Sequence, residues 1–405
     1  MKHLHLSEKT KGWLYVGLQV MIIILAAAIG YFSHNFITLR QGEYDLVNEA
    51  IQLIQENALV EIPPEQKLQH GMIRGLLETL NDPYTYFVEP AAHEVQTDQL
   101  TGSFGGIGVR LERDIEMNWR LFPFPDSPAV KAGIEDGDIL VGVDDLEITA
   151  KTTDIDLIAA VRGPVGQEVN ISVLRGTEII NFQIARDNVP LPTVSWNLLP
   201  EVEGIGLVKV NRISETTANE VENAIQALMD QDATSFILDL RNNGGGLVEA
   251  GVEIVNLFLE EGEILRQQFN QDKEEIFTVT EPGPLTDISM VILVNANTAS
   301  SAEIVAGALK KHDRARIIGS PTFGKTSIQY IFDLKDGSSI HITSGKWWIP
   351  GVNFPLQPDY VVEEDSAGVN ALQKAIEILE EEKFKYRYFK MNQFTKKTNS
   401  FWILV

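Results

Sequence analysis

The chain has 405 residues, which exceeds one ordinary domain and indicates two or three. Apolar residues make up 44 % of it and charged residues 22 %, so a largely disordered chain is excluded. The formal net charge of −24 argues against nucleic-acid binding, and the absence of cysteine excludes disulfides, thiolate nucleophiles and cysteine-ligated zinc.

A membrane segment is predicted near the amino terminus. Residues 13–32 are 20 positions without a charged side chain, enough for a helix to span roughly 30 Å of hydrocarbon. Lysines precede this run, which favours a cytoplasmic tip over residues 1–12 and a single-pass anchor over residues 13–35. The expected location is therefore the cell membrane, with the catalytic part outside the cytoplasm. A cleaved signal peptide is the alternative, because residues 26–28 are all alanine.

Residues 36–100 are predicted to form a helical region. Apolar side chains recur at helical spacing over residues 45–59 and again over residues 70–80, and Pro63-Pro64 separates the two runs. The two helices could form a dimerisation arm or a packed cap. A homodimer is thus one expectation.

The composition then changes twice along the chain. Short β-like runs punctuated by glycine (residues 107–111, 139–143 and 169–173) surround a helix-like stretch at 153–161, which predicts one compact domain over residues 101–187. From about residue 204, strand and helix alternate: residues 236–240 precede a helix at 247–259, and residues 290–295 precede a helix at 301–311. The expected fold class is an α/β multidomain protein.

Three features in the second half of the chain could carry chemistry. Ser300 lies between an apolar strand and a helix, where unpaired amides and the helix dipole favour a nucleophile and its oxyanion, although Ser300 and Glu303 also form a capping-box pattern. Lys325 follows glycine after an apolar strand and, if buried, would lose its proton and act as a base; an ordinary surface lysine is the alternative. Residues 244–246 are three glycines that could expose amides to a ligand or simply form a tight turn.

Metal and nucleotide chemistry have little support. The seven histidines show no metal-ligand spacing outside the first residues, so no metal site is expected. The glycine-rich run at 102–108 precedes a strand and no helix follows it, so it does not match a dinucleotide loop. No cofactor is expected.

Nine short motifs together resemble one known family. They are Asp82-Pro-Tyr-Thr-Tyr, Gly102-Ser-Phe-Gly-Gly-Ile-Gly-Val, Ser127-Pro-Ala-x-x-Ala-Gly, Asp136-Gly-Asp-Ile-Leu, Arg162-Gly-Pro-x-Gly, Asp239-Leu-Arg-Asn-Asn-Gly-Gly-Gly, Thr298-Ala-Ser-Ser-Ala-Glu-Ile-Val-Ala-Gly-Ala-Leu, Thr322-Phe-Gly-Lys-x-Ser-x-Gln and Gln357-Pro-Asp. In this order they resemble the C-terminal processing peptidases, also called tail-specific proteases. The resemblance implies a PDZ domain over residues 101–187, a crotonase-like α/β protease core over residues 188–385 and a tail of 386–405 without a family counterpart.

The resemblance also implies roles for particular residues. The catalytic residues would be Ser300 as nucleophile, with Ser301 as its rival, Lys325 as base and Gln329 as the group that orients the lysine. The oxyanion hole would comprise Gly245, Gly246 and the amide of Ser301. The substrate-binding residues of the PDZ domain would be Gly105, Gly106, Ile107, Gly108 and Val109. Arg162 would sense a loaded groove and contact the catalytic domain, or be a solvent-exposed turn residue.

The favoured function is a membrane-anchored, extracytoplasmic serine endopeptidase that cleaves proteins near apolar C-termini held by the PDZ domain. The alternative is a catalytically idle PDZ scaffold that tethers partner C-termini. Residues 401–405 are apolar and end in a free carboxylate, so they either occupy a PDZ groove or pack on the body of the protein.

Overall fold

The computed structural model describes residues 45–149, 151–200, 202–270, 274–363 and 369–398. The predicted anchor, the cytoplasmic tip and the apolar end of the tail lie outside these ranges. Among the described helices, none is both long enough and apolar enough to cross a membrane. The chain divides into two compact units, residues 1–73 and residues 74–405.

The helical region contains α2 (Asp45–Asn57) and α3 (Glu65–Glu78), followed by β1 (Tyr86–Val88) and α4 (Pro90–Thr101). The first two helices agree with the predicted ones. Several large apolar side chains of α2 are exposed, among them Leu46, Leu53 and Ile54. Neither β1 nor α4 was predicted from the sequence, and β1 belongs to a sheet of the predicted protease core.

The predicted PDZ domain contains an antiparallel sheet of five strands in the order β3-β4-β5-β7-β8, with β6 (Leu146–Glu147) paired to β5. Its strands are β3 (Val109–Arg113), β4 (Trp119–Pro123), β5 (Asp138–Val143), β7 (Glu168–Arg175) and β8 (Glu178–Ala185). The helices α5 (Pro128–Ala132) and α6 (Asp154–Val161) complete it. Alternate residues of β7 point inward, so that Val169, Ile171 and Val173 are fully buried in a core separate from that of the protease.

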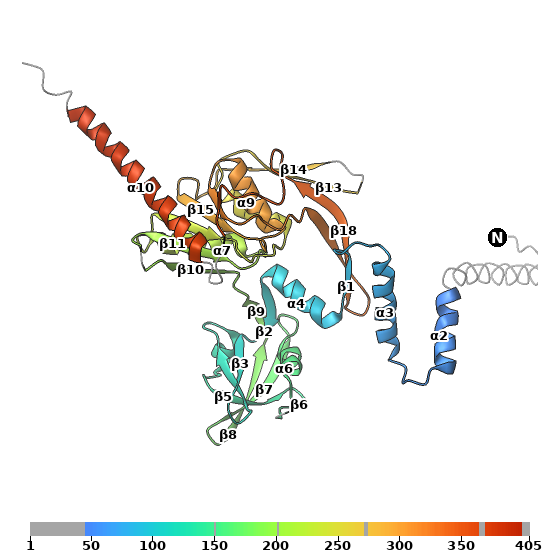
Figure 1. The fold of residues 1–405 in the computed structure, drawn as a ribbon. Helices are drawn as coiled ribbons and strands as arrows, with labels where there is room; N and C mark the ends of the chain where they lie inside the picture. Colours follow the sequence, from blue (N-terminus) through green and yellow to red (C-terminus); the bar gives the residue numbers. More distant parts are fainter. Residues whose placement is uncertain (1–44, 150, 201, 271–273, 364–368, 399–405) are drawn as a thin grey trace, which may run out of the picture. The chain divides into compact units, whose positions relative to one another are not determined.

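Two short strands connect the PDZ domain to the rest of the chain. The chain enters the domain through β2 (Ser103–Gly106) and leaves it through β9 (Asp187–Pro190), and these two strands pair in antiparallel orientation. The domain is therefore an insertion that begins and ends at one two-stranded ribbon (Figure 1).

The predicted protease core has a six-stranded sheet in the order β10-β11-β12-β15-β16-β19. The strands are β10 (Val194–Leu198), β11 (Ile205–Val210), β12 (Ser235–Asp239), β15 (Ser289–Val294), β16 (Arg316–Gly319) and β19 (Tyr360–Val361), parallel except for β10. One core cluster joins this sheet to α7 (Thr217–Met229), α8 (Val248–Asn256) and α9 (Ser301–Lys311), and a second joins it to α10 (Val369–Thr398). Helices thus cover both faces, as expected for a parallel sheet.

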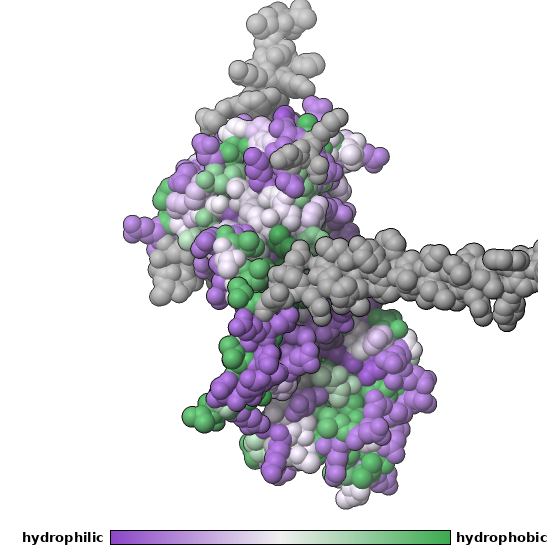
Figure 2. Space-filling view, turned by 90° about the vertical axis from the view of Figure 1, so that its right-hand side faces the viewer, coloured by the Kyte–Doolittle hydropathy of each residue, from purple (hydrophilic) through white to green (hydrophobic). Residues whose placement is uncertain are grey.

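A second sheet of the core is antiparallel, in the order β1-β18-β13-β14, with β17 also paired to β18. It comprises β13 (Glu263–Phe269), β14 (Glu275–Thr278), β17 (Ser327–Asp333) and β18 (Ser339–Trp348), together with β1. The predicted α/β multidomain fold is confirmed. Hydrophilic side chains cover much of the face seen in Figure 2, with smaller apolar patches between them.

Candidate active site

The two parallel strands β12 and β15 are neighbours, so the loops at their carboxyl ends meet at one edge of the sheet. An asparagine network ties these loops together: Asn242 accepts from Asn295 and Asn297 at 3.0 Å each. The amide of Ala299 donates to the carbonyl of Asn243 at 2.9 Å. This arrangement brings the triple glycine next to Ser300.

Ser300 has an unusual backbone conformation immediately before α9. Its φ is 55° and ψ is −126°, in a region that costs a non-glycine residue free energy of about 1–3 kcal/mol. Its amide donates to the carboxylate of Glu303 at 3.0 Å. Ser300 is half-buried and lines a cleft of about 760 Å³.

Ser301, the rival nucleophile, lies in a different environment. It is fully buried, and its hydroxyl has no hydrogen-bond partner among the described residues. A side chain at Gly251 of α8 would meet the Cβ of Ser301 at 3.1 Å, so Ser301 faces the contact between α8 and α9. Of the two serines, Ser300 is the one that lines the cleft.

The cleft also contains Lys325 and the triple glycine. Its walls include Gly244, Gly245, Gly246, Lys325 and Gln329. Burial lowers the pKa of Lys325 from its ordinary value, and the charge of Asp82 partly opposes this. The ammonium of Lys325 lies 5.0 Å from the ring centroid of Tyr84 and has no hydrogen-bond partner in the described part of the chain.

Glu303 connects the two candidate catalytic segments. It is fully buried and accepts from the amides of Ser300, Gly324 and Lys325 and from the hydroxyl of Thr322. Burial raises its pKa even though these four hydrogen bonds act in the opposite direction. In the sequence, Glu303 stands out only as part of a capping pattern, because its contacts with residues 322–325 depend on the folded chain.

The triple glycine approaches the serine loop very closely. Gly245 has a φ of 93°, and a Cβ there would lie 2.7 Å from the carbonyl oxygen of Ala299. The amide of Gly245 already donates to Asn243 at 2.8 Å. The amides of Gly246 and Ser301, in contrast, donate to no other group within the residues that the structure describes.

Gln329 lies on β17 in the same cleft, where its amide nitrogen donates to Ser327 at 3.0 Å and approaches the Thr343 hydroxyl at 3.5 Å. No hydrogen bond joins it to Lys325 among the described residues. Its orienting role stays a prediction.

The residues predicted to bind a substrate tail lie at the start of the PDZ domain. Gly105 and Gly106 belong to β2, Gly108 has a φ of 72°, and Val109 begins β3. Ile107 is 1 % exposed and packs in the domain core. The binding role of all five stays a prediction.

Arg162 is not a solvent-exposed turn residue. Its guanidinium donates to Asp98 of α4 at 2.6 Å and stacks 4.2 Å from the ring centroid of Phe104. The side chains of Arg162 and Asp98 are only 20 % and 17 % exposed. Because α4 also contributes Gln96 and Gln99 to the cleft wall, this ion pair joins the PDZ domain to a helix of the active site.

Known proteins share these features. Residues 204–365 match Peptidase family S41, and residues 125–175 match the PDZ domain. A probable CtpA-like serine protease of Staphylococcus haemolyticus is 30 % identical over 365 residues, which are 87 % of this chain and 73 % of that protein. The chain belongs to peptidase family S41.

Other relatives agree with this assignment. The carboxy-terminal processing protease CtpA of Bacillus subtilis is 32 % identical over 308 residues, covering 76 % of this S41 peptidase and 65 % of that protein. The solved photosystem II D1 C-terminal processing protease is 26 % identical, with a TM-score of 0.43, over 77 % of this chain and 86 % of that one. From the family-model match and the two CtpA relatives, the chain is an S41 serine peptidase, a hydrolase of the C-terminal processing protease family.

Proposed function

We propose that this S41 peptidase is a membrane-anchored endopeptidase that cleaves proteins near their C-termini by a serine–lysine mechanism without a cofactor. The observation that carries the proposal is the shared cleft of Ser300 and Lys325, in which buried Glu303 accepts from the amides of both residues. One carboxylate thus holds the main chains of a nucleophile and of a partly desolvated amine in the same cleft, as a serine–lysine dyad requires.

The mechanism follows from the groups in the cleft. Neutral Lys325 accepts the proton of the Ser300 hydroxyl as the oxygen attacks a substrate carbonyl, forming a tetrahedral intermediate. The amides of Gly246 and Ser301 are the oxyanion donors, since the amide of Gly245 is engaged by Asn243. The protonated lysine then gives its proton to the leaving amine, and water attacks the acyl-enzyme in a second cycle of the same proton transfer.

The PDZ domain is proposed to hold the substrate. Residues 105–108 would present main-chain amides to the terminal carboxylate of a protein with an apolar C-terminus, and Val109 would contact its last side chain. Arg162 would report the occupied groove to α4. The ion pair between Arg162 and Asp98 supports this coupling.

The anchor and the extracytoplasmic location are proposed from the sequence of residues 1–35. We also propose a homodimer contact through α2, because an amphipathic helix with Leu46, Leu53 and Ile54 exposed offers an apolar surface to a second copy. An idle PDZ scaffold, which is the competing function, would need neither a buried amine nor a strained serine. Both are present in the cleft.

Alanine variants of the two serines and of the lysine test the dyad. A model protein with an apolar tail is incubated with each variant, and the fragments are identified by mass spectrometry. Ser300→Ala and Lys325→Ala should lower kcat/KM by about 10³-fold or more, whereas the buried Ser301→Ala is the matched control and should cleave the substrate. Lys325→Arg should also be inactive, because a guanidinium keeps its proton.

Each outcome has a clear meaning. Cleavage by Ser300→Ala together with loss of cleavage by Ser301→Ala would move the nucleophile to Ser301. Full activity of either lysine variant would eliminate the dyad. Binding of apolar tails by a wild-type protein that cleaves none of them would favour the scaffold.

A further inference from the structure

The turn at residues 82–86 lies against the lysine of the cleft, although it precedes the PDZ domain in the chain. The ring of Tyr84 faces the ammonium of Lys325 with 5.0 Å to the ring centroid. Asp82 and Lys325 attract each other, since each charge stabilises the ionised form of the other. Tyr86, at the end of the same turn, lines the cleft.

Hydrogen bonds fix this turn on β18. Asp82 accepts from the amide of Tyr84 at 3.1 Å and from the hydroxyl of Thr85 at 2.7 Å. The Thr85 hydroxyl in turn accepts from the amide of Thr343 at 3.0 Å. Because Thr85 is buried, the position of the turn relative to the lysine is set by the fold.

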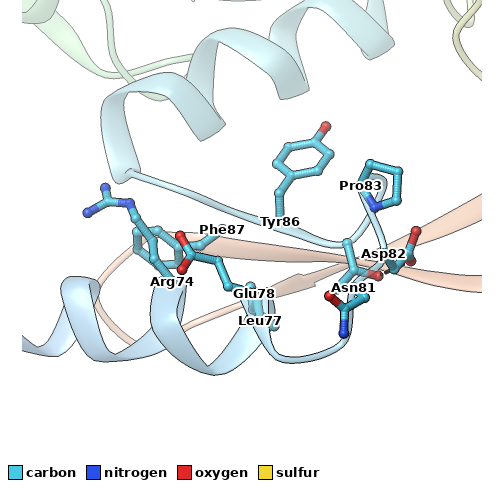
Figure 3. Close-up of a pocket in the computed structure, with 9 residues that line it drawn as sticks. Arg74, Leu77, Glu78, Asn81, Asp82, Pro83, Tyr86 and Phe87 are labelled. Atoms are coloured by element: carbon cyan, nitrogen blue, oxygen red, sulfur yellow. Dashed lines mark hydrogen bonds between the residues drawn. The ribbon is translucent and has the colours of Figure 1, made fainter.

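Asp82 stays charged over the pH range in which a lysine titrates. The hydroxyls of Thr343 and Thr85 lower its pKa, and burial opposes them only partly. Its other side borders a second pocket of about 510 Å³. Figure 3 shows Asn81, Asp82 and Pro83 at one end of this pocket and Arg74 and Phe87 at the other.

The other ionisable groups near Lys325 leave Asp82 as the main opposing charge. On β18, His341 has its pKa lowered by burial, and also by His93 and Lys325, so it is neutral where the lysine works. On α9, Glu303 accepts from the main-chain amide of Lys325.

Charged residues also line the remaining walls of the cleft. They are Arg212, Glu249 and Glu275, from the loop after β11, α8 and β14. None of them is among the groups that shift the pKa of Lys325.

We propose that Asp82 and Tyr84 are positioning residues that set the pH at which Lys325 becomes a base, with Tyr84 excluding water and Asp82 supplying an opposing negative charge. A catalytic base works best when it becomes neutral near the working pH. Burial alone would make the amine easy to deprotonate but weakly basic, and Asp82 restores part of its basicity. The inference rests on the proposed dyad.

The test measures Ser300 reactivity against pH with a fluorophosphonate probe, which needs no substrate tail. Asp82→Asn keeps a hydrogen-bond acceptor but removes the charge. The acid limb of the pH profile of the labelling rate should therefore move to lower pH. At one pH unit below the wild-type midpoint, the fraction of maximal labelling rate should rise about twofold or more. Tyr84→Ala admits water to the amine and should move the limb to higher pH, whereas Tyr84→Phe keeps the ring and should not move it.

A control variant separates charge from structure. Thr85→Val breaks the bond to β18 and the bond to Asp82 but leaves both charges in place, so it should lower the maximal rate and move the midpoint less than Asp82→Asn does. If Asp82→Asn leaves the midpoint unchanged, or moves it upward, the inference is wrong while the dyad stands. Failure of the dyad itself has a separate signature, which is normal labelling of Lys325→Ala.

Discussion

Glu303 holds the serine and lysine segments together through main-chain contacts. Its carboxylate is fully buried, and the amides of Ser300 and Lys325 donate to the same oxygen at 3.0 and 2.9 Å. Side-chain rotamers of the two catalytic candidates can change without breaking these bonds. The separation of their backbones therefore depends on a residue that takes no part in the proton transfer itself.

Glu303→Gln should reduce both stability and activity. One carboxylate oxygen becomes an NH₂ group that faces N–H or O–H donors, which leaves buried donors unsatisfied at a cost of roughly 2–4 kcal/mol. We expect kcat/KM to fall by about 100-fold or more, because a small displacement of reacting groups is costly. Urea unfolding and steady-state kinetics measure the two effects.

Thr322→Val is the milder control for that substitution. It removes one donor to Glu303 and the acceptor of the Leu356 amide, and should cost about 1–3 kcal/mol. Wild-type kinetics in Glu303→Gln would contradict the role assigned to the carboxylate.

Lys325→Met should make the protein more stable while abolishing activity. Burial lowers the pKa of this lysine in the folded state, so folding carries a cost wherever the amine must stay charged. That cost is fully present below the folded-state pKa and disappears as pH rises through the unfolded value of about 10.4.

The expected gain from Lys325→Met at neutral pH is about 0.5–2 kcal/mol, in the usual range of stabilising substitutions. It should shrink toward zero above about pH 10.4. Chemical denaturation of both proteins at several pH values checks this. A gain that does not depend on pH would mean that packing, and not desolvation, is responsible.

At the scale of elements, α4 connects the PDZ domain to the cleft that contains Ser300 and Lys325. Asp98 on this helix binds Arg162 of the PDZ domain, and Gln96, Gln99 and Leu100 on the same helix line the cleft. A shift of the PDZ domain can therefore move part of the cleft wall without any change within the protease sheet.

Removing this ion pair should weaken the effect of tail binding on cleavage. In Arg162→Ala and in Asp98→Asn, the ratio of cleavage rates for a tailed and a tailless substrate should fall by about 5-fold or more, within the usual range of coupling between sites. The double variant should behave like either single one, because both act on one contact. A ratio equal to that of wild type in all three would exclude coupling through α4.

Some elements could be predicted from the sequence and others could not. The helix of residues 301–311 was predicted with its observed bounds, because apolar periodicity and the serine at its start agree. α4 has no buried residue, so it offers no apolar period to find. β17 is exposed from Tyr330 onward, and its pairing with β18 is a tertiary contact.

The same limit applies to the site. Motifs identified Ser300, Lys325 and the glycines, but the positive φ of Ser300 and the contacts of Glu303 with residues 322–325 appear only in the folded chain. Asp82 was noticed only as part of a motif. Its relation to Lys325 depends on a strand that pairs across most of the sequence.

At the scale of the whole molecule, the proposed anchor would determine where the peptidase works. The full chain should sediment with membranes and resist extraction at high pH, whereas a chain that begins at residue 45 should not. Protease added outside the membrane should digest the body of the full chain. Because a charge at mid-span costs about 2.5–3.5 kcal/mol, Ile23→Asp with Ile24→Asp should weaken retention.

Mass measurement of the membrane-bound protein separates the two interpretations of the apolar segment. An intact amino terminus supports an anchor. A chain shortened near residues 26–28, and released from the membrane, would contradict it and favour a cleaved signal peptide.

The pairing of β1 with β18 also affects when the enzyme becomes active during its synthesis. The hydrogen bond from Thr343 to Thr85 spans 258 residues. At about 5–20 residues per second, a ribosome makes the second partner roughly 10–50 s after the first. Until then the surroundings of Lys325 are incomplete. Because the active site cannot form before this point, the nascent chain cannot cleave itself.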